Sequence, residues 1–315
     1  MAEDQLHVVF GAGQVGRALA AQLSTMGLSV RTVSLHRPEC VGPDVDCRIA
    51  DLTDAEAAID AGKGASVVYQ CLGVPYTQWP TKFPPLQRHV IGAAERAGAL
   101  LVTLENVYAY GDTDGRPLTE DLPLLATTSK GRTRAAMTVE LFEAEQTGRV
   151  SISIGRASDF FGPGVTQSTL GARVFANAIA GKRADFIGNP DLPHTYSYVP
   201  DIAKCLATLG TDQRAIGQVW HLPGPETVTT RALLDIIADR VGHPVAIRNV
   251  PKSAMHVLGM FSPMMRGLAE MSYEFDQPFI LDTSKYEATF GATPTLLTSA
   301  IDDTVAWYRA QGNPR

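Results

Sequence analysis

Residues 7–23, HVVFGAGQVGRALAAQL, read as a short apolar strand, a glycine-rich turn and the start of an amphipathic helix. The three glycines have the G-x-G-x-x-G spacing. The first permits a tight turn, the second lets the backbone approach a pyrophosphate, and the third lets the helix pack on the strand. The free N–H groups and positive dipole end of such a helix favour phosphates. The stretch therefore predicts a bound dinucleotide, held by Gly11, Gly13, Gln14, Val15 and Gly16.

Composition limits the class of protein. The 315 residues are 45% hydrophobic and carry a net charge of −6, which is typical of a globular protein with one large or two modest domains. The acidic balance argues against nucleic acids and anionic membranes as partners. There is no secretory signal and no apolar stretch long enough for a membrane span, so we expect a cytoplasmic protein. The seven histidines do not cluster with carboxylates, and we expect no metal site.

The four cysteines show no metal or redox spacing. They form no C-x-x-C pair, and in a cytoplasmic protein we expect reduced, buried or incidental thiols at Cys40, Cys47, Cys71 and Cys205.

Strand and helix patterns alternate over the first half of the chain. After the first strand and helix, strands are expected at 28–35, 46–50, 66–73, 99–104 and 149–155, and helices at 55–61, 86–97 and about 127–147. A proline-rich loop is expected over 73–85. This alternation predicts an α/β fold, a right-handed, doubly wound parallel sheet of the Rossmann type.

Beyond residue 155 the pattern becomes irregular and richer in proline and glycine. We therefore expect a nucleotide-binding domain over 1–155 and a smaller substrate lobe over 156–315, interleaved with the last elements of the sheet. The Met-rich stretch 255–271 suggests either a flexible apolar lid over a substrate or a segment of core or subunit interface.

The end of the second strand bears on the choice of nucleotide. A carboxylate there would bind the ribose hydroxyls of NAD, and a basic residue would favour the 2′-phosphate of NADP. The chain reads Ser34-Leu35-His36-Arg37, with no acid before Glu39. We expect NADP to be preferred over NAD, with His36 and Arg37 near its ribose. The alternative is that Arg37 is a solvated surface charge.

With these pieces in order, the chain resembles the extended short-chain dehydrogenase/reductases, the NAD(P)-dependent epimerase/dehydratase group, over nearly its whole length. Motifs similar to the family's occur in family order: the glycine loop, Asp51-Leu52, Cys71-Leu72-Gly73, Tyr110-Gly111, Arg156 with Gly162-Pro163-Gly164, residues 195–203 and residues 282–291. The resemblance implies that Asp51 and Leu52 contact adenine and that Cys71, Leu72 and Gly73 lie beside a nucleotide ribose.

The chain also departs from the family pattern. Glu140 resembles a family Glu on the catalytic helix, and counting back from it puts Ala136 at the Lys position and Arg132 at the Tyr position. Asn106 stands where the family has Ser or Thr. The chain therefore resembles an atypical member that lacks the Tyr-x-x-x-Lys pair. Asp159 would repel a diphosphate, and His194 lies near the family's diphosphate-binding Arg, which makes nucleotide sugars less favoured substrates.

Other polar residues are candidates for the chemistry. Asn106 and Tyr108 alternate after the fifth strand and would share a face, so Asn106 would bind a substrate carbonyl and Tyr108 would supply a proton. The alternative for Tyr108 is core packing, and Tyr110 is expected to be structural. Lys130 or Arg132 would neutralise an anionic group. Lys130 and Arg134 share a helix face; the alternative is a solvated turn, or an ion pair with Asp159.

Three functions remain open. The first is an NADP-preferring oxidoreductase acting on a small carbonyl or hydroxyl compound. The second is an epimerase or dehydratase that recycles its nucleotide internally. The third is a nucleotide-binding sensor or scaffold without catalysis. A homodimer through the helices at 86–97 and 127–147, which the family uses, is plausible.

Overall fold

The computed structural model describes residues 5–36, 40–250, 267 and 269–312. Within these ranges, parallel strands form a seven-stranded sheet in the order β11-β6-β5-β4-β1-β2-β3. Their bounds are Leu6–Phe10 (β1), Ser29–Ser34 (β2), Val45–Ile49 (β3), Ala65–Gln70 (β4), Leu100–Asn106 (β5), Ile152–Ala157 (β6) and Gln218–His221 (β11). The chain runs outward from β1 to β3, then returns to β4 on the other side of β1. The predicted doubly wound α/β fold is confirmed.

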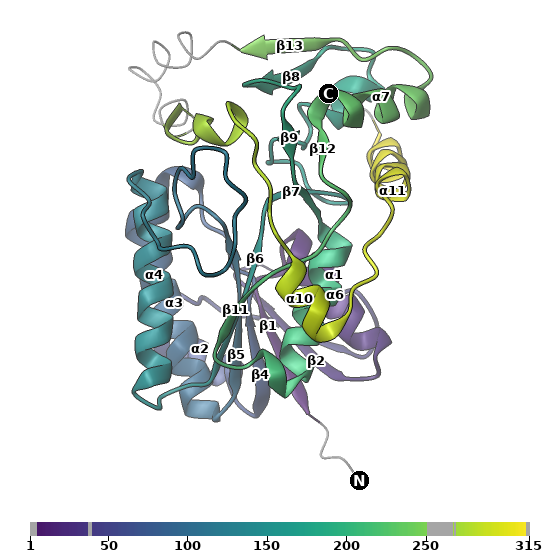
Figure 1. The fold of residues 1–315 in the computed structure, drawn as a ribbon. Helices are drawn as coiled ribbons and strands as arrows, with labels where there is room; N and C mark the ends of the chain where they lie inside the picture. The colour runs from purple at the N-terminus through teal and green to yellow at the C-terminus, as the bar shows by residue number, and fades with distance from the viewer. Residues whose placement is uncertain (1–4, 37–39, 251–266, 268, 313–315) are drawn as a thin grey trace.

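Helices cover both faces of the sheet (Figure 1). One face carries α1 (Gln14–Thr25) and α6 (Val199–Thr211), and the other carries α2 (Ala55–Gly62), α3 (Trp79–Ala97) and α4 (Ser129–Gln146). In α1, the buried residues Val15, Leu19 and Leu23 recur every four positions, so a single apolar stripe packs on the strands. Two separate apolar cores result, one on each side of the sheet.

The start of α3 differs from the sequence prediction. The expected proline-rich loop over 73–85 is wrong from Tyr76 onward, because a 3₁₀ turn (η1, Tyr76–Gln78) leads directly into a helix that contains Pro84 and Pro85. In these first turns Trp79 contacts Tyr76 and Phe83 edge-on, with ring centroids 5.3 and 5.6 Å apart. These contacts stabilise the first turns of α3.

The second half of the chain completes the sheet and adds a smaller lobe. Strand β6 runs across residue 155, and β11 and α6 belong to the sheet layers. The lobe lies over the carboxyl ends of the strands (Figure 1). Its elements are β7 (Asp159–Phe161), α5 (Phe175–Ile179), β8 (Ala184–Ile187), β9 (Pro193–His194), β10 (Tyr196–Tyr198), β12 (Val228–Thr229), α7 (Thr230–Val241), β13 (Ile247–Val250), η3 (Ser272–Phe275) and α11 (Leu297–Ala310). The 3₁₀ turn η2 (Gln213–Ala215) and helix α10 (Ser284–Phe290) pack against the core on the α1 and α6 side of the sheet.

The cysteines depart from expectation in one respect. Cys40 and Cys47 form a disulfide between the segment after β2 and strand β3, so the expectation of reduced thiols is wrong for this pair. The two sulfurs come together because β3 runs beside β2, a proximity that the spacing in the sequence does not reveal. Cys71 and Cys205 are free.

Two further observations concern the described part of the chain. No helix in it has the length and apolar character needed to cross a membrane. Of the Met-rich stretch 255–271, for which a lid or an interface was expected, residues 255–266 and 268 lie outside the described residues.

Candidate functional site

The glycine loop joins β1 to α1 at the carboxyl edge of the sheet. Gly11 has a φ of +102°, and a Cβ there would lie 2.5 Å from the carbonyl oxygen of Cys71. A Cβ on Gly16 would lie 1.8 Å from the carbonyl oxygen of Gly11. At Gly13, by contrast, a Cβ would meet no described atom within 4 Å. Close backbone contacts within the protein therefore require glycine at positions 11 and 16, whereas Gly13 borders open space.

That open space adjoins the N-terminus of α1. Gly13 is the N-cap and has no side chain to satisfy the first N–H groups, and the first turn, residues 14–17, contains no acid. Val15 is buried in the core, and Gln14 is partly exposed beside the loop. Unsatisfied N–H groups, a positive dipole end and room above Gly13 fit a pyrophosphate.

The residues expected near the adenosine lie along the same edge. Asp51 is exposed and its Oδ1 accepts hydrogen bonds from the backbone N–H and the hydroxyl of Thr53, at 2.9 and 2.7 Å. These bonds lower the pKa of the Asp51 carboxyl. Leu52 is buried, while His36 is exposed after the end of β2. Arg37 lies outside the described residues.

Cys71, Leu72 and Gly73 follow β4, which is the neighbour of β1 in the sheet. The backbone N–H of Cys71 donates to the carbonyl of Phe10 at 2.8 Å and holds this turn against the glycine loop. Burial raises the pKa of the Cys71 thiol to about 12, which keeps it protonated. The segment is thus in place to line a nucleotide, but the thiol is no nucleophile.

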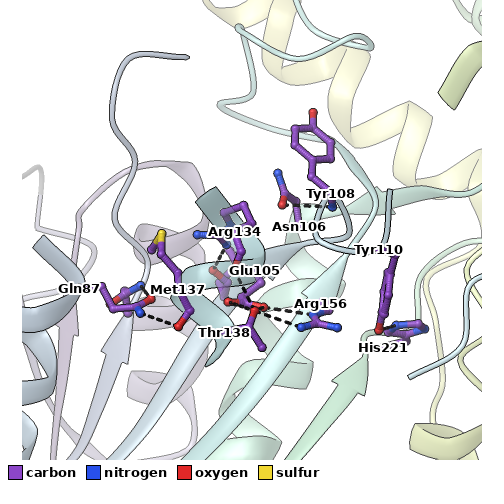
Figure 2. A network of polar contacts seen from close by, with 12 residues as sticks. Gln87, Glu105, Asn106, Tyr108, Tyr110, Arg134, Met137, Thr138, Arg156 and His221 are labelled. Carbon is purple, nitrogen blue, oxygen red and sulfur yellow. Dashed lines mark hydrogen bonds and ion pairs between the residues drawn. The ribbon is translucent and has the colours of Figure 1, made fainter. Parts of the chain in front are cut away.

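Two of the catalytic candidates follow β5 at this edge. The Oδ1 atom of Asn106 accepts from the backbone N–H of Tyr108 at 3.4 Å, which orients the amide. Tyr108 stacks on Trp79 with ring centroids 5.8 Å apart, and its hydroxyl is hydrogen-bonded to that of Tyr76. Figure 2 shows Tyr108 pointing away from the buried contacts below it. The ring of Tyr108 is therefore packed, while its hydroxyl faces other polar groups.

The hydroxyl end of Tyr108 borders a cavity of about 50 Å³ between the sheet and the smaller lobe. Tyr76, Asp159 and Glu274 also line this cavity. Asp159 accepts a hydrogen bond from Nε2 of His194 at 2.8 Å, so its partner is not one of the cations at 130–134. Burial, followed by the nearby Asp159, raises the pKa of Glu274 well above its usual range. The cavity thus combines two phenols with the carboxyl groups of Asp159 and Glu274, and Asp185 also lines it.

Helix α4 presents its basic residues on opposite faces. Lys130 and Arg134 are buried, with exposed fractions of 6% and 3%, whereas Arg132 and Ala136 are exposed. Lys130 lies 4.2 Å from the centre of the Tyr76 ring and 3.6 Å from Glu270. The structure therefore brings Lys130 to the tyrosines, and it does not bring Arg132 there.

The positions counted back from Glu140 thus fall on the outer face of the helix. The inward pair four residues apart is Lys130 and Arg134. The guanidinium of Arg134 lies 4.9 Å from the Phe83 ring and donates to the carbonyl of Leu104 at 3.2 Å. Two cations, rather than a tyrosine and a lysine, occupy this inward face.

A fully buried ion pair lies directly beneath the candidate site (Figure 2). Nε of Arg156 on β6 donates to Glu105 on β5 at 3.1 Å, and both side chains are 1% exposed. The hydroxyl of Thr138 donates to the same carboxylate at 2.9 Å. These contacts hold α4 against β5 and β6. They therefore fix the position of the helix relative to Asn106 and Tyr108.

Tyr110 has a different environment from Tyr108. Nδ1 of His221 contacts the carbonyl of Asp282 at 2.9 Å, and a carbonyl only accepts, so Nδ1 carries the proton. Nε2 then accepts from the Tyr110 hydroxyl at 2.7 Å. Burial lowers the pKa of His221 to about 4, so the ring stays neutral. Tyr110 therefore connects the segment after β5 to β11 and to the residues just before α10, outside the cavity.

The chain was compared with known families. The sequence profile of the NAD-dependent epimerase/dehydratase family matches residues 7–222, from the first strand of the sheet to the last. The chain belongs to this family. No curated protein matches it significantly.

Solved structures share the fold of this epimerase/dehydratase family member. A dTDP-glucose 4,6-dehydratase from Streptomyces venezuelae, with NAD and TYD bound, is 19% identical and gives a TM-score of 0.80, with 97% of each chain covered. A UDP-glucuronic acid 4-epimerase from Bacillus cereus in complex with NAD is 17% identical, with a TM-score of 0.77 and coverage of 98% of this chain and 99% of that one. At these identities the likeness concerns the fold.

Sequence reasoning about this family member missed two groups in the cavity. Tyr76 lies in the segment expected to be a loop, and only the aromatic spacing of Tyr76, Trp79 and Phe83 hinted at a helix start. Glu274 follows the Met-rich stretch, and no motif marked it. No group of three or more His, Cys, Asp or Glu side chains that could hold a metal ion occurs among the described residues.

Proposed function

We propose that the protein is an NAD(P)-dependent oxidoreductase that acts on a small carbonyl or hydroxyl compound, with Tyr108 as the proton donor. The observation that carries this proposal is the position of the Tyr108 hydroxyl. It borders a cavity at the carboxyl edge of the sheet, next to Asn106 and two strands away from the glycine loop. Doubly wound folds place their ligands along this edge.

The residues that would hold the dinucleotide are those of the glycine loop and its neighbours. Gly11, Gly13, Gln14 and Gly16 would receive the pyrophosphate, Asp51 and Leu52 the adenine, and residues 71–73 a ribose. When bound, a reduced nicotinamide supplies the hydride that a carbonyl carbon needs for reduction to an alcohol. NADP is the preferred form in this proposal, because Ser34, Leu35 and His36 offer no carboxylate to a ribose.

Tyr108 is suited to donating a proton rather than to removing one. Burial is the largest cause that raises its pKa, and the nearby Asp159 raises it further. The phenol is therefore protonated at physiological pH and ready to protonate the oxygen of a carbonyl that receives a hydride. After this transfer Tyr76, which is hydrogen-bonded to Tyr108, would supply a proton to the Tyr108 oxygen. Asn106 would use its amide N–H to hold the same carbonyl oxygen.

Family membership favours a second candidate. In an epimerase or dehydratase, the hydride taken from the substrate returns to it within one catalytic cycle, and Tyr108 would act in turn as base and acid. Such an enzyme shows no net consumption of added NADPH. Its bound nucleotide would survive purification and would not exchange with free NADPH.

The test compares nucleotide binding and turnover. The purified chain is expected to bind NADPH at least ~10-fold more tightly than NADH, and to oxidise it with one or more members of a panel of small aldehydes and ketones. Tyr108→Phe is expected to lower kcat by ~10²-fold or more, which is the usual contribution of a positioned general acid. Tyr110→Phe is the matched control, because its hydroxyl contacts His221 outside the cavity.

The outcomes separate the three functions. Full activity in Tyr108→Phe would contradict the role given to this residue. Tight NADPH binding with no turnover on any compound would instead support the sensor or scaffold. Epimerisation without net NADPH loss would support internal recycling.

We also propose that the chain forms a homodimer in the cytoplasm through the outer faces of α3 and α4. Val139, on the outer face of α4, is a large apolar side chain that is 49% exposed, and an interface between two copies would cover it. Val139→Glu is expected to turn a dimer into a monomer in light-scattering measurements, and a wild-type monomer would contradict the proposal.

A further inference from the structure

The cavity beside Tyr108 contains an unusual set of acids. Glu274 of η3 is 1% exposed, and its Oε1 atom has no hydrogen-bond partner among the residues described. It faces Asp159 of β7, whose side chain is 13% exposed. A buried carboxyl oxygen without a partner is costly, since it loses water and gains no other bond. This oxygen is therefore available to accept a hydrogen bond from a donor group of a ligand.

The charges around the cavity do not compensate this pair. Asp185 also lines the cavity, and Arg248 pairs with it at 2.6 Å. Arg173 is the cation among the described lining residues, and its side chain is exposed to solvent. Lys130 is paired with Glu270. The inner wall of the cavity is thus rich in acceptors and poor in positive charge.

The charge of this wall determines which chemical groups of a substrate can bind beside it. A phosphate or diphosphate would bring further negative charge to two carboxyl groups in a poorly hydrated space, where charges interact strongly. An ammonium group offers three donors and a positive charge on a compact head. The aromatic rings of Tyr76 and Tyr108 would also favour a cation over an anion.

We propose that this cavity binds a primary ammonium group, so that the substrate is a small carbonyl or hydroxyl compound that also carries an amine. Glu274 and Asp159 are its acceptors, and Glu274 determines the preference for the positive charge. The substrate class rests on the proposed function, whereas the binding of an ammonium group does not need turnover. The small size of the cavity, about 50 Å³, fits a compact amine rather than a sugar nucleotide.

Binding is expected to release a proton. In the free protein Glu274 shares its surroundings with Asp159 and carries a proton. An ammonium ion stabilises the ionised carboxylate, so its arrival expels that proton and its affinity rises with pH until Glu274 is ionised in the free protein. Among the described residues, the other titratable or charged groups that line this space or contact its lining are Tyr273 from the same turn, Asp159, Asp185, Tyr76, Tyr108, His194, Arg173, Arg248, Lys130 and Glu270.

The binding experiment uses probes that cannot react. Butylammonium, butan-1-ol and butyrate share one carbon chain and differ in charge, and each is titrated by calorimetry into the full chain saturated with NADP⁺. We expect butylammonium to bind at least ~10-fold more tightly than butan-1-ol, and butyrate to bind more weakly than both. Titrations in buffers with different ionisation heats are expected to show proton release with butylammonium only.

Two variants identify the group responsible. Glu274→Gln keeps the shape of the protonated carboxyl but cannot ionise, so the ~10-fold preference for butylammonium should fall to about one and proton release should disappear. Asp276→Asn is the matched control, because Asp276 lies two residues later on the solvent side. A preference that survives in Glu274→Gln, or that is absent in the wild type, overturns the proposal.

Turnover then separates this inference from the proposed function. 4-Amino-2-butanone and 4-hydroxy-2-butanone are compared as substrates with NADPH, and the amine is expected to have the higher kcat/KM. Reduction of the hydroxyketone alone would support the oxidoreductase and overturn the ammonium site. Preferential binding of butylammonium without reduction of any ketone would support the site and contradict the oxidoreductase.

Discussion

Replacing Glu105 by Gln keeps the shape of the side chain and removes the negative charge that faces Arg156 beneath the candidate site. Both partners are 1% exposed, and the carboxylate also accepts from Thr138 at 2.9 Å. Removing one partner of a buried pair leaves an uncompensated charge, which costs about 3–5 kcal/mol. Arg134 also loses a nearby negative charge. We therefore expect a loss of unfolding free energy near the upper end of this range.

The loss converts into a measurable shift of the melting temperature. With an unfolding entropy of about 2 cal/mol/K per residue, the 315 residues give a shift of about 1.5 °C for each kcal/mol. Glu105→Gln is expected to lower Tm by about 5–8 °C in thermal unfolding followed by circular dichroism. The control is Glu95→Gln, whose pair with Arg149 is exposed, so its loss should leave Tm nearly unchanged.

A double variant distinguishes lost charge balance from lost packing. Glu105→Leu together with Arg156→Met removes both charges, and apolar replacements of buried pairs are often neutral or stabilising. The double variant should therefore recover most of the Tm lost in Glu105→Gln. Equal Tm shifts for Glu105→Gln and Glu95→Gln would refute this reasoning, because burial would then have no effect on the cost.

Two further predictions follow from the loop and from His221. Gly16→Ala should lower both Tm and NADPH affinity, since its Cβ would lie 1.8 Å from the Gly11 carbonyl oxygen. Gly13→Ala should weaken NADPH binding by ~10-fold or more at an unchanged Tm, because no described atom lies within 4 Å of its Cβ. Equal losses of Tm in the two variants would contradict this prediction. The pKa of His221 falls to about 4 in the folded chain, below about 6.5 in the unfolded chain. The neutral ring therefore contributes roughly 3 kcal/mol to the free energy of unfolding above pH ~6.5, and this contribution is lost as pH falls to ~4. Urea titrations at several pH values should show this fall in stability, and the fall should be smaller in His221→Gln. An identical pH dependence in the two proteins would contradict the prediction.

The sequence predicts those parts of the structure that depend on neighbours along the chain. The glycine loop and α1 follow from residues 7–23 because the turn, the helix dipole and the apolar stripe are all local properties. The i, i+4 spacing of Lys130 and Arg134 likewise predicts a shared face, and the structure buries both. Which face of α4 turns inward depends on packing against other elements, so the count from Glu140 did not reveal that Arg132 is exposed.

Other features depend on contacts between distant segments. The start of α3 was missed because aromatic packing, rather than local propensity, holds Trp79 and the prolines in a helix. Glu274 reaches the cavity from a turn far along the chain, and the disulfide of Cys40 with Cys47 requires β3 to pair with β2. No periodicity within a window of residues contains this information.

The order of strands in the sheet has a consequence for synthesis on the ribosome. When residue 157 has been made, β6 is the last strand of the sheet, and its free edge has no neighbour until β11, residues 218–221, is complete. The face of α1 that packs on α6 is exposed for most of the same interval. An unpaired edge and an uncovered apolar face both invite aggregation, so the nascent chain needs protection during this interval. A fragment that ends at residue 155 would keep the nucleotide loop and stay in this vulnerable state permanently.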